Sequence, residues 1–143
     1  MRSLGRVLII DDDPAVTAVY KVAFENEHFT AEVVNSGAAA FSTLVSFKPD
    51  AVVLDLNMPD IHGVRWLSTV RARPEFKDLP IVILTASPPD SPEVEAAIRA
   101  GVKGVLTKNQ WGAAAVTAAV KWALVKRDEP GAGDEINWSQ APR

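Results

Sequence analysis

Carboxylate side chains directly follow two of the apolar runs in this sequence. Asp11, Asp12 and Asp13 come after the first run, and Asp55 comes after the third. Carboxylates that lie close together repel one another, so a cluster of them makes chemical sense if a cation sits among them. Oxygen ligands without His or Cys favour a hard ion, and few carboxylates with room for water suit Mg²⁺. The acidic residues therefore predict a magnesium site if the fold brings them together.

A hydroxyl group and an ammonium group follow two further runs. Thr85 comes after the fourth run, and Lys108 comes after the fifth. A bound Mg²⁺ would draw in a phosphoryl group, a lysine ammonium pairs with one phosphoryl oxygen, and a threonine hydroxyl donates to another. A carboxylate in such a setting can act as a nucleophile and form an acyl phosphate. These residue types predict phosphoryl transfer to an aspartate.

The apolar runs predict the strands that must position these side chains. They cover residues 7–10, 31–34, 51–54, 81–84 and 104–106, and four of them are rich in Val, Ile and Leu without polar alternation. Such runs are typical of strands that are buried on both faces of a parallel sheet. Ligands of an open parallel sheet bind beyond the carboxyl ends of its strands, where the candidate residues fall.

Segments with helical spacing separate the predicted strands. We expect helices to begin near Pro14, after Ser36, and near Gly63, Ser91 and Gln110. The first has Asp13 as its N-cap and one apolar stripe, and the third has a shorter stripe. These stripes are Val16, Val19, Tyr20, Ala23 and Phe24, and Val64, Leu67 and Val70. A strand followed by a helix, five times over, predicts an α/β three-layer sandwich with right-handed crossovers.

The composition bounds the function. The chain has 143 residues, of which 48% are hydrophobic and 23% are charged, as in one globular domain. The absence of cysteine excludes disulfides, thiolate catalysis and cysteine-ligated zinc. A net charge of -3 gives no electrostatic footprint for nucleic acid. No apolar run is long enough for a bilayer or a signal peptide, so we expect a cytoplasmic protein without membrane insertion.

Four stretches of the sequence resemble the receiver domain of two-component response regulators, of the chemotaxis-regulator type. They are residues 7–14, 53–63, 80–86 and 101–108, which occur in the order and at the separations of that family. The resemblance covers about residues 5–127. It implies a flavodoxin-like (βα)5 fold, with a five-stranded parallel sheet in the order 2-1-3-4-5.

The resemblance also implies roles for individual residues. Asp55 corresponds to the phosphoacceptor, Thr85 to the switch hydroxyl and Lys108 to the phosphate-binding lysine. In the family, the phosphoryl group comes from a histidine kinase or a histidine phosphotransfer protein. The receiver catalyses transfer to its own aspartate and its own dephosphorylation, and it is not otherwise expected to be an enzyme.

The same resemblance implies a ligand set for Mg²⁺. Asp11 and Asp12 correspond to the acid pair that helps to hold the metal, together with the phosphoacceptor Asp55. Asn57 would supply its backbone carbonyl oxygen. Asp13 is expected to cap a helix and not to bind the ion.

Two positions depart from the family pattern. Asn109 stands where the family usually has a proline after the lysine, often joined through a cis peptide bond. Val105 stands three residues before the lysine, where the family usually has Tyr or Phe. The usual readout swings that aromatic ring inward, and valine has no ring to swing. Lys103, close by, is expected to be an ordinary surface lysine.

The output is expected to pass through protein contacts. Residues 128–143, which we expect to form a flexible tail, are too few for a DNA-binding output domain, so no direct DNA binding is expected. Trp111 and Trp122 lie on a second apolar stripe of the last predicted helix. This stripe either folds over neighbouring loops or forms a surface for a homodimer or a downstream protein.

Other functions fit the sequence less well. A haloacid-dehalogenase-like phosphatase also uses Asp, Thr, Lys and Mg²⁺, but it requires an Asp where Asn57 stands. A degenerate receiver that binds partners without phosphorylation is suggested by Val105 and Asn109, although the set of acidic, hydroxyl and lysine residues is complete. A Rossmann-type nucleotide binder lacks the glycine-rich loop after the first strand.

Overall fold

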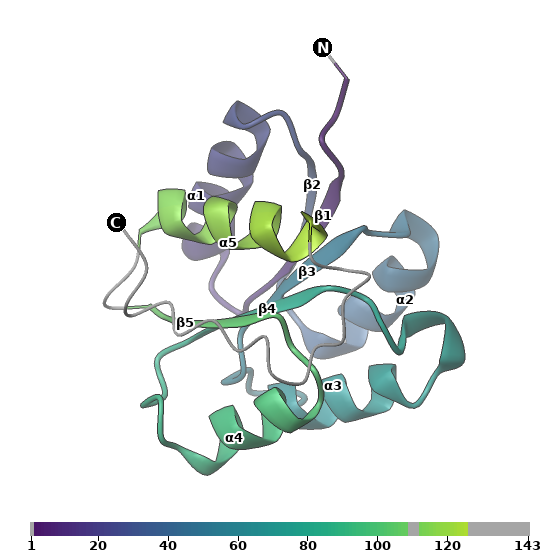
Figure 1. Cartoon of the computed structure of the whole chain (residues 1–143), viewed down its shortest axis with the longest axis vertical. Helices are drawn as coiled ribbons and strands as arrows, with labels where there is room; N and C mark the ends of the chain where they lie inside the picture. Colours follow the sequence, from purple (N-terminus) through teal and green to yellow (C-terminus); the bar gives the residue numbers. More distant parts are fainter. Residues whose placement is uncertain (1, 109–111, 126–143) are drawn as a thin grey trace.

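Five parallel strands form a single sheet in the order β2-β1-β3-β4-β5 (Figure 1). The computed structural model describes residues 2–108 and 112–125. The strands are β1 Arg6–Ile10, β2 Thr30–Val34, β3 Ala51–Leu54, β4 Ile81–Thr85 and β5 Gly104–Thr107. This strand order confirms the predicted flavodoxin-like fold.

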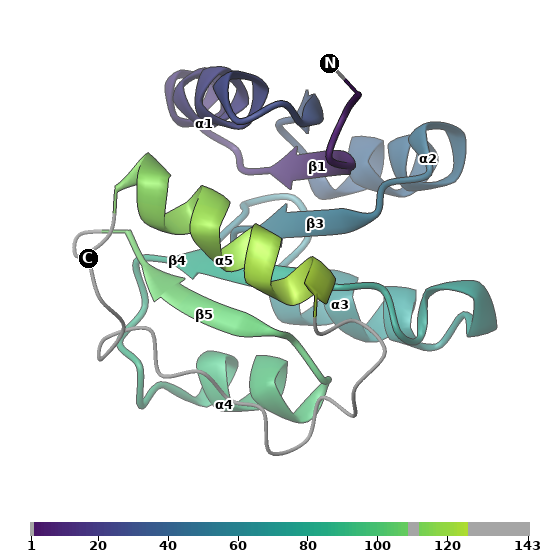
Figure 2. The same ribbon diagram turned by 45° about the horizontal axis from the view of Figure 1, so that its top comes forward.

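Helices cover both faces of the sheet, which makes three layers (Figure 2). Helices α1 and α5 lie on one face, and α2, α3 and α4 lie on the other. Their bounds are α1 Pro14–Asn26, α2 Gly37–Phe47, α3 Gly63–Arg71, α4 Pro92–Arg99 and α5 Ala113–Val125, with a 3₁₀ turn, η1, at Pro74–Phe76. The predicted tail, residues 128–143, lies outside the described residues, as do Asn109 and Trp111.

The strands are apolar throughout because each one contributes to two cores. Val7 and Ile9 of β1 pack toward α1 and α5, while Leu8 and Ile10 pack toward the helices of the opposite face. All four side chains are at most 1% exposed. A strand with helices on both sides needs apolar residues at successive positions, which explains the uninterrupted runs of the sequence.

Local signals set the starts of three helices as the sequence predicted. The Asp13 carboxylate accepts a hydrogen bond from the Ala15 backbone N–H at 2.9 Å, and Pro14 follows as the first residue of α1. Ser36 and Ser91 cap α2 and α4 in the same way. Each cap satisfies a backbone donor that the first turn of a helix leaves unpaired.

Three details of the packing differ from the sequence-based expectation. Val19 is 60% exposed, because the buried stripe of α1 is centred on Tyr20 and Phe24. Trp66, which we did not place in the core, is fully buried at the centre of α3. Lys103 is only 5% exposed, so its assignment as a surface lysine is wrong.

No helix among the described residues is both long and apolar enough to cross a membrane.

Gly63 is the position where the packing behind the sheet edge is tightest. A Cβ atom there would lie 2.5 Å from Leu56 Cα and 2.8 Å from the Asp55 carbonyl oxygen. Backbone atoms at that distance cannot move aside without displacing the end of β3. The first turn of α3 is therefore pressed against the segment that carries Asp55, and only glycine fits.

We predict that Gly63→Ala destabilises the protein by about 1–3 kcal/mol, the usual cost of overpacking. Gly112→Ala is the matched control, because a Cβ atom at Gly112 would meet nothing within 4 Å. Thermal or urea unfolding of both variants measures the difference. Equal stability of the two variants would show that the Asp55 segment yields freely and does not hold a fixed position.

Candidate functional site

The carboxyl ends of β1 and β3 bring three carboxylates together. Asp11, Asp12 and Asp55 each offer an oxygen atom, and these atoms lie within 4.8 Å of one another. Asp11 and Asp55 are buried at 2% exposure, whereas Asp12 is exposed to solvent. The structure thus brings together the three acidic residues that the sequence singled out as metal ligands. Solvent reaches this cluster from the side of Asp12.

Backbone hydrogen bonds hold these residues although each lies just past its strand. The Asp11 N–H donates to the Val34 carbonyl at 3.2 Å, and the Asp55 N–H donates to the Ile10 carbonyl at 2.9 Å. On the other side of the site, the Lys108 N–H donates to the Thr85 carbonyl at 2.9 Å. The ladder of the sheet therefore continues one residue into the site, which fixes where each side chain starts.

Lys108 lies between the two buried carboxylates. Its Nζ atom is 2.7 Å from Asp11 Oδ2 and 3.2 Å from Asp55 Oδ2. Burial of the ammonium group lowers the pKa of Lys108, but its hydrogen bonds and charge interactions with Asp11 and Asp55 outweigh burial and raise the pKa above its ordinary value. Lys108 is therefore a fixed positive charge at neutral pH.

Asp11 is the carboxylate of the cluster whose charged form is disfavoured. Burial raises the pKa of its carboxyl group, and the negative charge of Asp55 adds to this effect. The contacts with Lys108 and with the Asp13 backbone N–H oppose the rise and do not cancel it. Apart from its contact with Lys108, buried Asp11 Oδ2 receives no hydrogen bond from the described residues. This oxygen atom can therefore still bind a cation.

The donor set fits a hard divalent cation. Among the residues that the structure describes, three carboxylates face one ammonium group, so the cluster keeps an excess of negative charge. The underused Asp11 Oδ2 and the exposed Asp12 side chain are oxygen ligands of the kind that Mg²⁺ prefers, with room left for water. The acidic cluster is therefore compatible with Mg²⁺.

A second network links the ends of β3 and β4. Thr85 Oγ1 donates to the side-chain oxygen of Asn57 at 2.8 Å, and Ser87 Oγ donates to the same oxygen at 3.3 Å. The Asn57 backbone N–H donates to Asp55 Oδ1 at 3.0 Å. Asn57 thus touches the acidic carboxylate through its backbone and the Thr85 hydroxyl through its side chain.

Comparison with known proteins agrees with this geometry. The family described as "Response regulator receiver domain" matches residues 7–121.

The chain belongs to this family of receiver domains.

Curated relatives are longer than this chain. It is 30% identical to "DNA-binding response regulator MtrA" of Mycolicibacterium smegmatis over 103 residues, which make up 72% of this chain and 43% of the relative. It is 34% identical to "Response regulator MprA" of Mycolicibacterium vanbaalenii over 131 residues, which make up 90% of this chain and 54% of the relative. The chain thus spans about half the length of these relatives, and the match is to their receiver part.

Solved structures share the fold at low sequence identity. A CheY-like receiver domain protein from Methanospirillum hungatei has a TM-score of 0.80 at 19% identity, over 89% of this chain and 98% of that one. The chemotaxis regulator CheY4 of Vibrio cholerae has a TM-score of 0.75 at 22% identity, over 86% and 99% of the two chains. Receiver domains interact with histidine kinases and in general serve signalling, not metabolic catalysis.

Two side chains around the receiver site make contacts that the sequence did not predict. Asn35 donates to the Asp11 carbonyl at 2.9 Å and to Thr17 Oγ1 at 3.1 Å, so it anchors the loop after β1. Asp60 accepts hydrogen bonds from the first two backbone N–H groups of α2, which lower the pKa of its carboxyl group. The only signal for Asn35 was its position directly after the second predicted strand.

Val105 and Trp122, which the sequence singled out for different reasons, are both half-buried against apolar residues. Val105 is half-buried and packs against the core under α3 and α4, so an aliphatic side chain stands where the family usually has an aromatic ring. Trp122 is also half-buried and packs against the core shared by α1 and α5. The exposed apolar surface of α5 is therefore smaller than the stripe in the sequence indicated, and Val125, at 78% exposure, is its largest described member.

We predict that Asp11→Asn raises the free energy of unfolding by about 1 kcal/mol at pH 7 without Mg²⁺. The substitution removes a buried charge that repels Asp55 and keeps an oxygen acceptor for the Asp13 N–H. The folded-state pKa of Asp11 is raised above 3.8, so the wild type loses stability as the pH rises through that folded value. The gain of the variant should therefore shrink as the pH falls through the folded pKa of Asp11, and it should be lost below the unfolded value of 3.8.

Urea unfolding at several pH values measures this gain. Asp90→Asn, in an exposed loop, is the control for the loss of one negative charge. A destabilised Asp11→Asn variant at pH 7 would mean that the ion pair with Lys108 outweighs the cost of burying the carboxylate.

Proposed function

We propose that this receiver accepts a phosphoryl group on Asp55, with Mg²⁺ bound, from a histidine kinase or a histidine phosphotransfer protein. The observation that carries the proposal is the position of the Asp55 carboxylate, which is buried, held by the Asn57 N–H, in contact with Lys108 and within 4.8 Å of the acidic pair. We propose that the receiver unit spans residues 5–127 and works in the cytoplasm, consistent with the lack of cysteine.

The side chains of Asp11, Asp12 and Asp55, with the backbone carbonyl of Asn57, would hold the magnesium ion. When bound, it neutralises negative charge on the carboxylates and on the incoming phosphoryl oxygens. The cluster has the excess charge that such an ion offsets, because its three carboxylates share one lysine within the described part of the chain. Lys108 is already placed to pair with one phosphoryl oxygen, since its ammonium group contacts the Asp55 carboxylate at 3.2 Å.

The transfer needs little covalent chemistry from the protein. A carboxylate oxygen of Asp55 attacks the phosphorus atom of the phosphohistidine donor, a P–O bond forms and the P–N bond breaks. The electron pair of the broken bond returns to the imidazole nitrogen of the donor. The contributions of the receiver are position and charge, which dominate phosphoryl transfer in general.

We propose that Thr85 carries the signal away from the phosphoryl group. Its hydroxyl donates to Asn57 in the structure, so it must exchange that acceptor for a phosphoryl oxygen when Asp55 is modified. That exchange moves the end of β4 and biases the loop that leads to α4. Val105 excludes the ring movement that is usual in the family, so the response has to travel through backbone and loop packing.

We propose that the output passes through protein contacts and not through direct DNA binding. Self-association through α5 stays a hypothesis, which rests on Val125 and the exposed part of Trp122 among the described residues. A degenerate receiver that binds partners without phosphorylation is the alternative that Val105 favours. The response to a phosphoryl mimic distinguishes this alternative from a receiver that is phosphorylated on Asp55.

We predict that beryllofluoride, a phosphoryl mimic, shifts the NMR signals of Thr85, Asn57 and Lys108 when Mg²⁺ is present. Asp55→Asn removes the attacking carboxylate and should abolish the response, whereas Asp78→Asn, at an exposed position, should leave it unchanged. Omission of Mg²⁺ should weaken the response strongly, because three carboxylates then repel the anion.

An equal response of the wild type and Asp55→Asn would reject Asp55 as the phosphoacceptor. No response from any variant would favour the degenerate receiver. Release of phosphate from small phosphate esters over many turnovers would instead indicate a phosphatase.

We also predict that Asn57→Ala binds beryllofluoride about fivefold to tenfold more tightly than the wild type. The variant lacks the oxygen that holds the Thr85 hydroxyl, so the switch no longer has to break that hydrogen bond, worth about 1 kcal/mol. The backbone carbonyl proposed as a metal ligand is retained. Ser87→Ala is the control, because it removes only the longer bond of 3.3 Å and should change affinity less than twofold.

Titrations followed by tryptophan fluorescence or NMR give the affinities. An Asn57→Ala variant that binds beryllofluoride as the wild type does, or more weakly, would show that the Thr85–Asn57 bond does not oppose the switch.

A further inference from the structure

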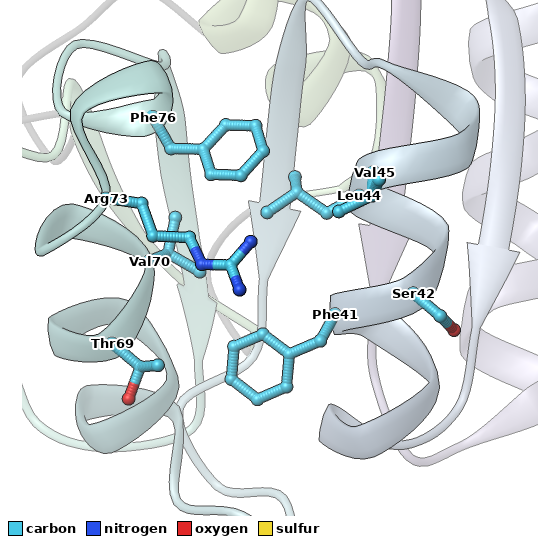
Figure 3. A pocket seen from close by; sticks show the side chains of 8 residues that line it. All are labelled: Phe41, Ser42, Leu44, Val45, Thr69, Val70, Arg73 and Phe76. Carbon is cyan, nitrogen blue, oxygen red and sulfur yellow. The ribbon is translucent and has the colours of Figure 1, made fainter.

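A groove between α2 and α3 lies away from the acidic site. It has a volume of about 400 Å³, which falls within the usual range for small-molecule sites. Its walls are mostly apolar, and Figure 3 shows them with the Arg73 side chain reaching in from the end of α3. The lining residues are Phe41, Ser42, Leu44, Val45, Thr69, Val70, Arg73 and Phe76.

The two aromatic walls of this groove are held in place by the protein itself. Phe41 stacks on the buried ring of Trp66, with 5.5 Å between the ring centroids. Phe76 lies on η1, and its carbonyl accepts a hydrogen bond from Arg71 at 2.9 Å. The Arg71 guanidinium also donates to the carbonyls of Leu79, Ala100 and Gly101. The groove is therefore formed before any ligand arrives, which reduces the entropic cost of binding.

Arg73 is the one charged side chain that lines the groove, and it is free to bind an anion. Its guanidinium makes no hydrogen bond or ion pair within residues 2–108 and 112–125, and it is exposed. Figure 3 shows it between the rings of Phe41 and Phe76. The hydroxyls of Ser42 and Thr69 donate instead to carbonyls of their own helices. Recognition of a polar ligand group at this place therefore depends on Arg73.

The wall opposite Arg73 carries no charge that would compete for it. None of the 11 residues of α2 is charged, and Val45 of that helix is 54% exposed beside the groove. An exposed helix without a single charged residue is unusual, since the outer face of a surface helix is normally polar. The groove thus combines an apolar bed with one unpaired guanidinium, which matches a flat apolar molecule that carries one carboxylate.

We propose that this groove binds a small aromatic carboxylate, with the ring against the apolar walls of the groove and the carboxylate paired with Arg73. A guanidinium and a carboxylate form two parallel hydrogen bonds, and the apolar walls remove the ring from water. The proposal is independent of phosphorylation, because none of the lining residues belongs to the acidic site.

The test uses 2-naphthoate as the probe and the full chain as the protein. Two-dimensional ¹H–¹⁵N NMR follows the indole N–H of Trp66, which has no described hydrogen-bond partner, and the backbone signals of Thr69 and Val70. We expect saturable shifts at these positions with a Kd on the order of 1 mM, the affinity that a ligand of this size reaches at ordinary efficiency. The neutral analogue 2-naphthalenemethanol should bind about tenfold more weakly.

Two variants in the groove and two controls outside it complete the test. Arg73→Gln should weaken naphthoate binding about tenfold, and Val45→Glu, which places a carboxylate at the groove, should weaken it at least as much. Both positions are exposed, so the fold should be retained. Arg65→Gln, on the exposed part of α3, and Asp55→Asn should each bind naphthoate within twofold of the wild type.

Three results would overturn the proposal. They are the absence of saturable shifts at the groove up to about 10 mM naphthoate, equal binding of naphthoate by Arg73→Gln, and equal binding of the neutral analogue. A beryllofluoride response that is lost while naphthoate still binds would concern only the phosphoacceptor, and it would leave the groove proposal supported.

Discussion

The repulsion among Asp11, Asp12 and Asp55 is the constraint around which this protein is organised. Their oxygens approach within 4.8 Å, two of the three residues are buried, and one lysine offsets part of the charge. Left to itself, such a cluster would push the sheet edge apart or take up protons, and the pKa of Asp11 is indeed raised, first by burial and then by the charge of Asp55. Its persistence requires a frame that holds the carboxylates in place at a cost in stability.

The frame is built from the backbone, which explains why it resists the repulsion. The residues of the site continue the hydrogen bonding of the sheet by one position, so the side chains start from fixed points. Behind Asp55, the first turn of α3 leaves no room even for a methyl group at Gly63. A carboxylate held in this way cannot relax away from its neighbours, so the excess negative charge of the cluster remains available to attract a cation.

The strand-end residues could be predicted from the sequence because their positions follow from periodicity alone. Uninterrupted apolar runs locate the strands, and parallel topology brings their carboxyl ends to one edge, which places Asp11, Asp55 and Lys108 together. The contacts between side chains could not be predicted in this way. Asn57 stands two residues after Asp55, but nothing in that spacing reveals that its side chain accepts from Thr85.

The wrong predictions about the core have the same cause, since they too depend on contacts between side chains. On α1, Val19 is as apolar as Val16, and only the packed structure shows that the buried stripe is centred on Tyr20. Trp66 fits the spacing of buried residues in α3, yet the sequence does not show that Phe41 of another helix stacks on it. Likewise, Gly63 can be read from sequence as a flexible turn, whereas its role is close approach to the backbone.

Helix α3 connects the acidic site with the groove, since it begins at Gly63 behind Asp55 and ends two residues before Arg73. A shared helix does not by itself couple two sites, because coupling requires an element with two arrangements that both ligands bias. Both ends of α3 are fixed, by the tight packing at Gly63 and by the four hydrogen bonds of the Arg71 guanidinium. The proposed Thr85 switch, by contrast, would act on the loop before α4. The fixed ends of α3 therefore favour two sites that bind independently, although Arg71 also joins Phe76 at the groove to the end of α4.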